Sequence, residues 1–234
     1  MKKITAIILI LLLVFGAVSC GNDNEAKKLP KGATEDEANY PKRQKNNFAE
    51  NDNETGMTYN FTLDKYTTAF NTMYVKLGGD VEDYPYKKWK KKSDEKRSNG
   101  KLYNYYYLDS GEIILTATEE DESRKLVNIG CGITVDKFNT RKNMKNKVMT
   151  VCGIMAAVSG GYSASDVNFF SNLFVDTITS DEHCFWYEDN IYLYDKEITE
   201  NGKATILFRT MPAAKNIEDD WNLQDYKDYW FENQ

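Results

Sequence analysis

Apolar and polar residues follow a pattern along the chain that predicts two rounds of helix followed by strands. The first helix begins after Thr62, whose hydroxyl can cap it, and ends at Gly78-Gly79. Its apolar side chains recur at spacings of three and four residues, at Leu63, Tyr66, Phe70, Met73 and Leu77. We therefore expect one face of this helix to pack against a core.

An antiparallel meander should follow the first helix. Strands are predicted over 101–108, 112–118 and 125–135, with polar or glycine-containing turns between them. In the third strand the apolar residues occupy every second position: Val127, Ile129, Cys131, Ile133 and Val135. Such alternation is typical of a strand with one face on a core.

The second round repeats this order. Apolar positions from Met144 to Ala156 predict a helix, Gly160-Gly161 interrupts it, and Ser165-Asp166 begins another helix, which together suggest a helical hairpin. Strands are then predicted over 184–187, 191–199 and 203–211, and Pro212 should stop the last one.

The predicted fold class is α+β, with helices on one face of an antiparallel sheet or sheets, in the order helix, β-meander, helical hairpin, β-meander. Two similar lobes would fit the same order. In layout alone the chain resembles tandem helix-plus-sheet folds such as the β-lactamase-inhibitor-protein class. That resemblance implies little about function, because one fold can host many functions.

The first twenty residues have the pattern of an export signal. Lys2 and Lys3 precede an apolar run, Ile4 to Phe15, that is too short to span a bilayer comfortably. The sequence Ala17-Val18-Ser19-Cys20 that follows resembles the lipobox of bacterial lipoproteins. The resemblance implies that residues 1–19 are a signal peptide and that Cys20 becomes a lipidated N-terminus on the extracytoplasmic face of the cell membrane.

An unlipidated alternative stays open for this N-terminus. Ala17 and Ser19 are also the small residues that an ordinary signal peptidase accepts, so the chain could instead be secreted without a lipid.

Three further segments are expected after the signal peptide. Residues 20–56 are polar, with few apolar side chains, and should form a disordered tether of roughly 30 Å behind the lipidated cysteine. Residues 57–214 should form the α+β domain. Residues 215–234 are rich in aromatic and acidic side chains, and we expect them to dock on the domain rather than hang loose.

The charge balance excludes one class of partner. Without the two lysines of the signal peptide, the chain has 28 basic and 36 acidic residues, which argues against nucleic acid. One local basic run, Lys87 to Lys92 around Trp89, could bind an anionic polymer. Because Asp94 and Glu95 follow this run directly, we favour the alternative that it is an exposed edge strand, whose lysines prevent it from pairing with a strand of another molecule.

Cysteine and histidine positions limit redox and metal chemistry. An exported chain could form a disulfide between two of Cys131, Cys152 and Cys184, or bury all three as small apolar residues. The single histidine, His183, is next to Cys184 and would point to the opposite side of a strand. We expect no metal site and no cofactor.

The sequence contains no familiar catalytic motif, and the acid pairs Glu119-Glu120 and Asp219-Asp220 lie in predicted turn or tail contexts. We therefore expect no catalytic residue and favour a binding or interaction module of the cell envelope, with a protein or glycan partner. An inhibitor or immunity-type lipoprotein and a carboxylate-based hydrolase of wall polymers are the alternatives.

Aromatic side chains on the predicted strands are the candidate binding surface, because their rings offer contact area at little cost in entropy. The candidates are Tyr103, Tyr105, Tyr107, Tyr192, Tyr194 and Trp89. The competing interpretation is that these tyrosines line the sheet beneath the helices or lie singly on the surface.

Overall fold

The structure is a computed structural model that describes residues 58–140, 143–179, 183–187, 190–198 and 204–213. The predicted signal peptide, the tether with Cys20 and the C-terminal segment lie outside these described residues. Within them, no helix is long and apolar enough to cross a membrane.

The first helix forms where the sequence predicts it. Helix α2 covers Leu63–Lys76, and the Thr62 hydroxyl accepts a hydrogen bond from the Lys65 backbone N–H at 3.4 Å. The chain leaves the helix through Gly78, whose φ of 91° is unfavourable for any residue with a side chain. The buried residues of α2 include Tyr66 and Phe70, which join the main core.

The strands of both predicted meanders also form, within one or two residues of the expected positions. These six strands are β2 Leu102–Asp109, β3 Ile114–Glu120, β4 Leu126–Thr134, β5 Cys184–Tyr187, β6 Asn190–Ile198 and β7 Ala204–Pro212, and a further strand, β1 Lys90–Lys96, precedes them. The edge strand that was predicted for Lys87 to Lys92 begins only at Lys90, because residues Tyr86–Lys88 form a 3₁₀ turn. β1 lies at the edge of the sheet, and all seven of its residues are exposed. Pro212 is the last residue of β7 rather than the residue after it.

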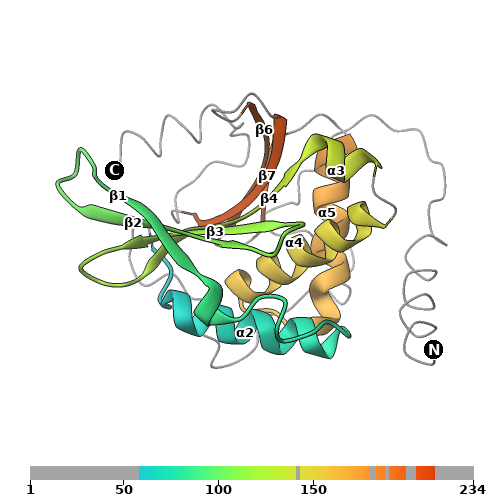
Figure 1. The fold of residues 1–234 in the computed structure, drawn as a ribbon, viewed down its shortest axis with the longest axis horizontal. Helices are drawn as coiled ribbons and strands as arrows, with labels where there is room; N and C mark the ends of the chain where they lie inside the picture. Colours follow the sequence, from blue (N-terminus) through green and yellow to red (C-terminus); the bar gives the residue numbers. More distant parts are fainter. Residues whose placement is uncertain (1–57, 141–142, 180–182, 188–189, 199–203, 214–234) are drawn as a thin grey trace, which may run out of the picture.

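A single antiparallel sheet contains all seven strands, in the order β1-β2-β3-β4-β7-β6-β5 (Figure 1). The two meanders meet where β4 pairs with β7, with Cys131 opposite Phe208. This arrangement confirms the predicted α+β class. The meanders are therefore two halves of one sheet and not two separate lobes.

In the described residues, the α-helices α3, α4 and α5 lie between the two meanders. Helix α3, Val135–Thr140, was not expected, because Val135 continues the alternation of β4 and reads as strand. Helix α4, Met144–Gly160, and helix α5, Val167–Thr179, form the predicted hairpin. Gly161 has a φ of 80° and caps α4, which explains the interruption by glycine.

Helix α4 is the centre of the molecule. It packs against α2, α5 and strands β4, β6 and β7, and its residues from Val151 to Gly160 are all buried. Close packing of the hairpin depends on Gly153, because a Cβ there would lie 2.2 Å from Ser171 Oγ and 2.5 Å from the Val167 carbonyl oxygen.

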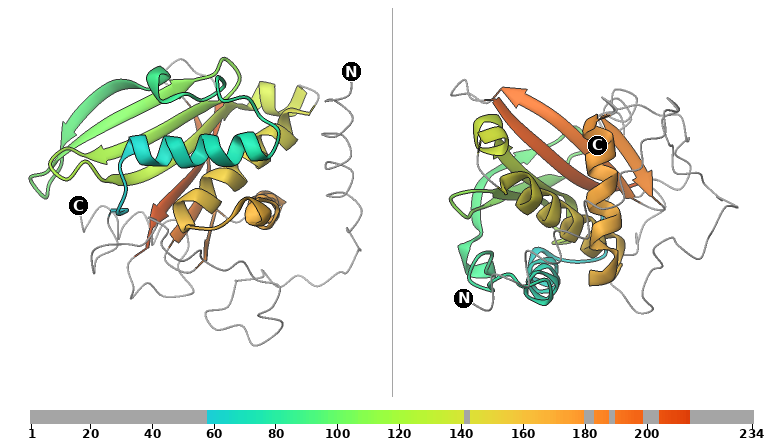
Figure 2. Two further views of the ribbon diagram at one scale, coloured as in Figure 1. Left: turned by 90° about the horizontal axis from the view of Figure 1, so that it is seen from below. Right: turned by 90° about the vertical axis from the view of Figure 1, so that its right-hand side faces the viewer.

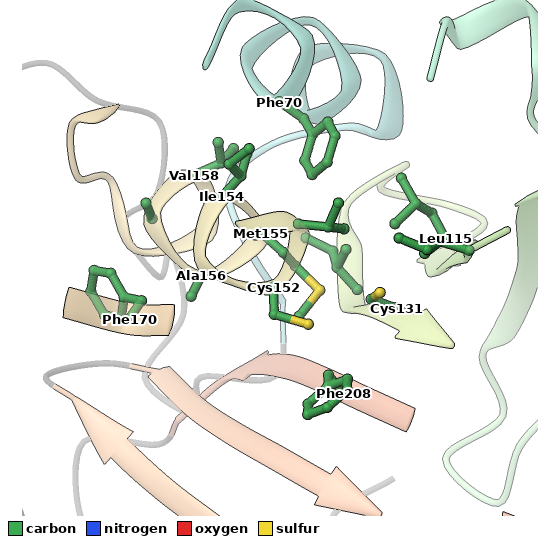
Figure 3. Close-up of a cluster of buried hydrophobic side chains, with 14 of the residues drawn as sticks. Phe70, Leu115, Cys131, Cys152, Ile154, Met155, Ala156, Val158, Phe170 and Phe208 are labelled. Carbon is green, nitrogen blue, oxygen red and sulfur yellow. The ribbon is translucent and has the colours of Figure 1, made fainter. Parts of the chain in front are cut away.

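The helices α2, α4 and α5 cover one face of the sheet (Figure 2). We call this the helix face, and the other the open face. The main core fills the space between the helix face and α4, with Phe70, Cys131, Phe170 and Phe208 contributed by four different elements (Figure 3).

Side chains alternate between the two faces along most of each strand, so strand register decides which face each candidate residue occupies. Val127 is an exception to the predicted alternation of β4. The pairing of β3 with β4 shifts at Thr118 and Glu119, and Val127 lies on the open face instead of with Ile129 and Cys131.

Candidate functional site

The three tyrosines of β2 lie on the open face. Tyr106 and Leu108 of the same strand pack into the main core, so the residues between and before them point the other way. Tyr103 is 4% exposed, while Tyr105 and Tyr107 are half-buried. Strand β2 thus presents a row of aromatic rings that runs from a covered end at Tyr103 to a more open end at Tyr107.

Arg97, from the turn after β1, holds the covered end of this row in place. Its guanidinium carbon lies 4.3 Å from the centroid of the Tyr103 ring, and its Nη2 donates to the Tyr105 hydroxyl at 3.0 Å. The Tyr105 hydroxyl in turn donates to Glu95 Oε2 at 2.7 Å, and Asn99 Nδ2 donates to the Tyr103 hydroxyl at 2.8 Å. Burial, together with the hydrogen bond to Glu95, raises the pKa of Tyr105 although Arg97 opposes the shift.

The turn that supplies Arg97 and Asn99 follows from local sequence. The Arg97 backbone N–H donates to the Lys101 carbonyl, and Gly100 takes a φ of 81°. Sequence reasoning did not assign Arg97, Asn99 or Glu95 to the site. The available signal was the pair Asn99-Gly100, which is typical of a turn and stands directly before the first predicted strand, so that the residues preceding it can lie alongside β2.

A second polar group lies at the same end of the sheet, on the helix face. The Glu119 side chain is 2% exposed, and Arg124 Nε contacts its Oε1 at 2.9 Å. Tyr106 donates to the same oxygen at 3.4 Å, and Asn104 Nδ2 donates to Asp121 Oδ1 at 2.7 Å. Burial raises the pKa of Glu119, because the loss of water outweighs the attraction of Arg124.

The neighbouring Glu120 behaves in the opposite way. It follows Glu119 at the end of β3 and pairs in register with Tyr103, so it lies on the open face. Burial alone would raise the pKa of Glu120, but hydrogen bonds from Lys101 and Ser123 lower it. The two carboxyl groups were expected in a turn and instead end a strand, buried on opposite faces, so they do not converge on one substrate position.

The structure places Tyr192 and Tyr194 of β6 on the helix face, opposite to the β2 tyrosines. Tyr192 is fully buried, with its ring centroid 4.8 Å from that of Phe185 and 5.7 Å from that of Phe170. Tyr194 is half-buried, 5.6 Å from the Phe208 ring centroid. The interpretation that tyrosines line the sheet under the helices is therefore correct for β6.

The six aromatic candidates consequently do not form one surface. Trp89 is half-buried and packs against the main core just before β1. Tyr192 pairs in register with Thr210 of β7, which in turn pairs with Ile129 of β4. Tyr192 therefore lies on the same face of the sheet as the buried residue Ile129. Only Tyr103, Tyr105 and Tyr107 share the open face, and they are the part of the predicted surface that remains a candidate.

Two of the three internal cysteines lie together. Cys131 of β4 and Cys152 of α4 are fully buried between helix and sheet (Figure 3). Burial and a hydrogen bond with Cys131 both raise the pKa of the Cys152 thiol. Cys184 of β5 pairs in register with Leu193 and packs on the open face. All three cysteines are free thiols in the structure, and Cys131 and Cys152 are the two that contact each other.

The fold and the site define an α+β protein with one tyrosine-lined open face. In the part of the chain that the structure describes, no three His, Cys, Asp or Glu side chains are grouped as metal ligands would be. In comparisons with protein-family models, curated proteins and solved structures, nothing matches this chain. The case for function therefore depends on the residues themselves.

Proposed function

We propose that the protein is a lipid-anchored, extracytoplasmic lipoprotein that acts as a binding or interaction module of the cell envelope. Its location is supported by the signal pattern of Met1 to Cys20, where two acyl chains on the cysteine would hold the domain at the membrane. The tether of residues 20–56 would let the domain reach a partner beyond the headgroups.

The single observation that carries the binding proposal is the row of tyrosine rings on β2, of which Tyr103 and Tyr105 are held by polar side chains. Tyr105 is held by Arg97 on one side and Glu95 on the other, and Tyr107 follows it on the same face. Rings that are already ordered lose little entropy when they bind, so they contribute more of their contact energy to affinity.

The chemistry of the row suits a partner with both flat apolar surface and polar groups. A sugar ring or a protein surface in the envelope offers both, and the rings of Tyr105 and Tyr107 can stack against either. We therefore propose an envelope protein or a glycan as the partner.

The two alternatives make different demands on this surface. An inhibitor or immunity-type lipoprotein would use the same rings against one protein. A carboxylate-based hydrolase would need two converging acids, and the acid pair Glu119 and Glu120 is divided between the two faces of the sheet. The binding module is therefore the proposal that the geometry supports best.

A comparison of two variants tests the proposal. The double variant Tyr105→Ala and Tyr107→Ala removes the rings, while Tyr86→Ala removes a ring that is 47% exposed on the 3₁₀ turn before β1 and serves as the matched control. Each purified protein is titrated onto isolated cell walls and onto washed membranes of the host. We expect the double variant to lose about tenfold in affinity for one of the two fractions, and the control to keep it.

The two fractions also identify the class of partner. Retention on walls stripped of protein indicates a glycan, and protease-sensitive retention on membranes indicates a protein. Equal binding by the double variant, the control and the unmodified chain would overturn the proposal, provided that circular dichroism shows all three to be folded.

A further inference from the structure

An apolar cluster lies on the open face, beside the tyrosine row. Its members are Tyr103, Val127, Ile191, Leu193, Met211 and Ala213, with Tyr105 and Cys184 packed at its margin. Leu193 is 3% exposed and Met211 is 5% exposed. These values are as low as those of the main core, although α2, α4 and α5 all lie on the other side of the sheet.

The sheet cannot cover this cluster by itself. Strands of one sheet lie about 4.8 Å apart, so a neighbouring strand contacts a side chain only from the side. The outer end of that side chain is covered only by a second layer, which packs about 10 Å from the sheet. Every member of the cluster belongs to a strand or, in the case of Ala213, to the residue after one. In the described ranges, then, no helix or second sheet supplies that layer.

We infer that the C-terminal segment, residues 214–234, docks on this open-face cluster and forms the missing layer. The first support is the point where the segment begins. β7 ends at Pro212, which pairs with Asn190, and Ala213 is itself a buried member of the cluster. The segment therefore starts on the surface that we propose it covers.

Length and composition supply the second support. The cluster extends from β2 to β5, about 24 Å at the usual strand spacing, and the first seven residues of the segment can span about that distance when extended. The next eleven residues carry six large apolar side chains, at Trp221, Leu223, Tyr226, Tyr229, Trp230 and Phe231. These side chains are sufficient to cover a cluster of this size.

Charge gives the third support. Residues 214–234 contain six acidic side chains and two lysines. On the open face, Arg97 lies over the Tyr103 ring, and Arg209 of β7 pairs in register with Leu193. These two arginines border the cluster on its β2 and β7 sides, while Glu95 and Glu120 on the same face are already bonded within the domain. Acidic side chains of the segment therefore complement the arginines.

The other segments outside the described ranges fit less well. The connections at 180–182, 188–189 and 199–203 contain no large apolar side chain. Residues 21–55 contain only widely spaced large apolar residues, such as Leu29, Tyr40 and Phe48. A segment of that composition does not bury enough apolar surface to offset its ordering entropy.

Docking of this segment would also determine how much of the proposed binding surface a partner can reach. Tyr103 would be covered, Tyr105 would lie at the boundary, and Tyr107 would remain available. The inference is independent of the binding proposal, because it concerns the cluster and not the partner.

Methionine oxidation tests the inference directly, because peroxide converts an accessible thioether to the sulfoxide with release of water. The native protein, as the host processes it, is compared with a variant that ends at Ala213. Removal of residues 214–234 should raise the oxidation rate of Met211 about tenfold or more, while Met155 in the main core stays protected. A variant that lacks residues 21–55 is the matched control and should keep Met211 protected.

Each other outcome overturns the inference. Unchanged protection of Met211 after truncation means that the C-terminal segment is not the cover. Exposure of Met211 in the control variant assigns the cover to the tether. Protection that falls on dilution of the intact protein, together with a change in its mass in solution, assigns the cover to a second copy of the chain.

A second measurement applies if truncation unfolds the domain and oxidises Met155 as well. Benzoylphenylalanine is placed at position 226 of the intact chain and activated by light. We expect intramolecular cross-links to residues of β6 and β7 on the open face, such as Leu193 and Met211. Cross-links to α2, α4 or α5 would overturn the inference.

Discussion

The two meanders of the sheet carry similar tyrosine patterns and use them in opposite ways. In β2, Tyr103, Tyr105 and Tyr107 lie on the open face, where polar side chains hold the first two. In β6, Tyr192 and Tyr194 lie on the helix face among phenylalanine rings. Alternation of residue types identifies a strand, but the pairing of strands far apart in the chain decides which face is buried.

The largest difference between the meanders should appear in stability. Tyr192→Ala removes a fully buried ring that contacts Phe170, Phe174 and Phe185, so the free energy of unfolding should fall by about 3–5 kcal/mol. Tyr107→Ala removes a half-buried ring from the open face and should cost about 1 kcal/mol or less. Urea unfolding of both variants measures the two losses, and similar values would contradict the assignment of faces.

A smaller effect is expected from the group that orders the β2 tyrosines. Arg97→Ala removes the contact with the Tyr103 ring and the hydrogen bond to Tyr105, and should cost about 1–2 kcal/mol. Arg97→Lys keeps the charge but not the planar fork, so it should recover only part of this loss. Unfolding curves and the ring signals of Tyr105 in NMR spectra measure the effect. Full recovery by lysine would show that charge alone holds the rings.

The adjacent carboxyl groups should give opposite pH dependence. The folded pKa of Glu120 is lowered, so it stabilises the fold above the unfolded pKa and loses this contribution as pH falls through the folded value. The folded pKa of Glu119 is raised, so its contribution is present at low pH and is lost as pH rises through the folded value.

Two glutamine variants separate these contributions. Glu120→Gln should lower stability at about pH 7 and have little effect at about pH 3. Glu119→Gln should flatten the decline in stability that the buried carboxylate causes above about pH 4.5. Urea midpoints across this range provide the measurement, and parallel pH profiles for the two variants would contradict the different environments of the two side chains.

The cysteines give the smallest and most local prediction. In protein purified from its host, peptide mapping without reduction should find any internal disulfide between Cys131 and Cys152, because only these two thiols meet in the core. Cys184→Ala should leave that bond intact. A bond from Cys184 to either partner would contradict the register that places Cys184 on the open face.

Much of the fold could be predicted because its signals are local. The Thr62 cap, the glycines after α2 and α4, and the alternation in β4 each determine an element through neighbouring residues. Helix α3 was missed because Val135 continues the strand pattern of β4 into a short helix.

The candidate site was harder to predict because it depends on pairing over long distances. Nothing near Tyr192 in the sequence indicates that β7 will pair with β4 and turn this ring toward α5. The burial of Glu119 could not be predicted from the sequence either, since its partners Tyr106 and Arg124 come from a different strand and from the turn that follows. Polar residues at a strand end look like a turn until their partners are known.

Tyrosine footprinting on the native protein, first purified and then on intact cells, tests the central claim most directly. In the purified protein, hydroxyl radicals should modify Tyr107 and Tyr86 readily and leave Tyr192 unmodified, since Tyr192 is fully buried. On cells, a bound partner should protect Tyr107 while Tyr86 stays reactive. Reaction of Tyr192 as fast as Tyr107, or a Tyr107 that is no less reactive on cells than in solution, would contradict the account.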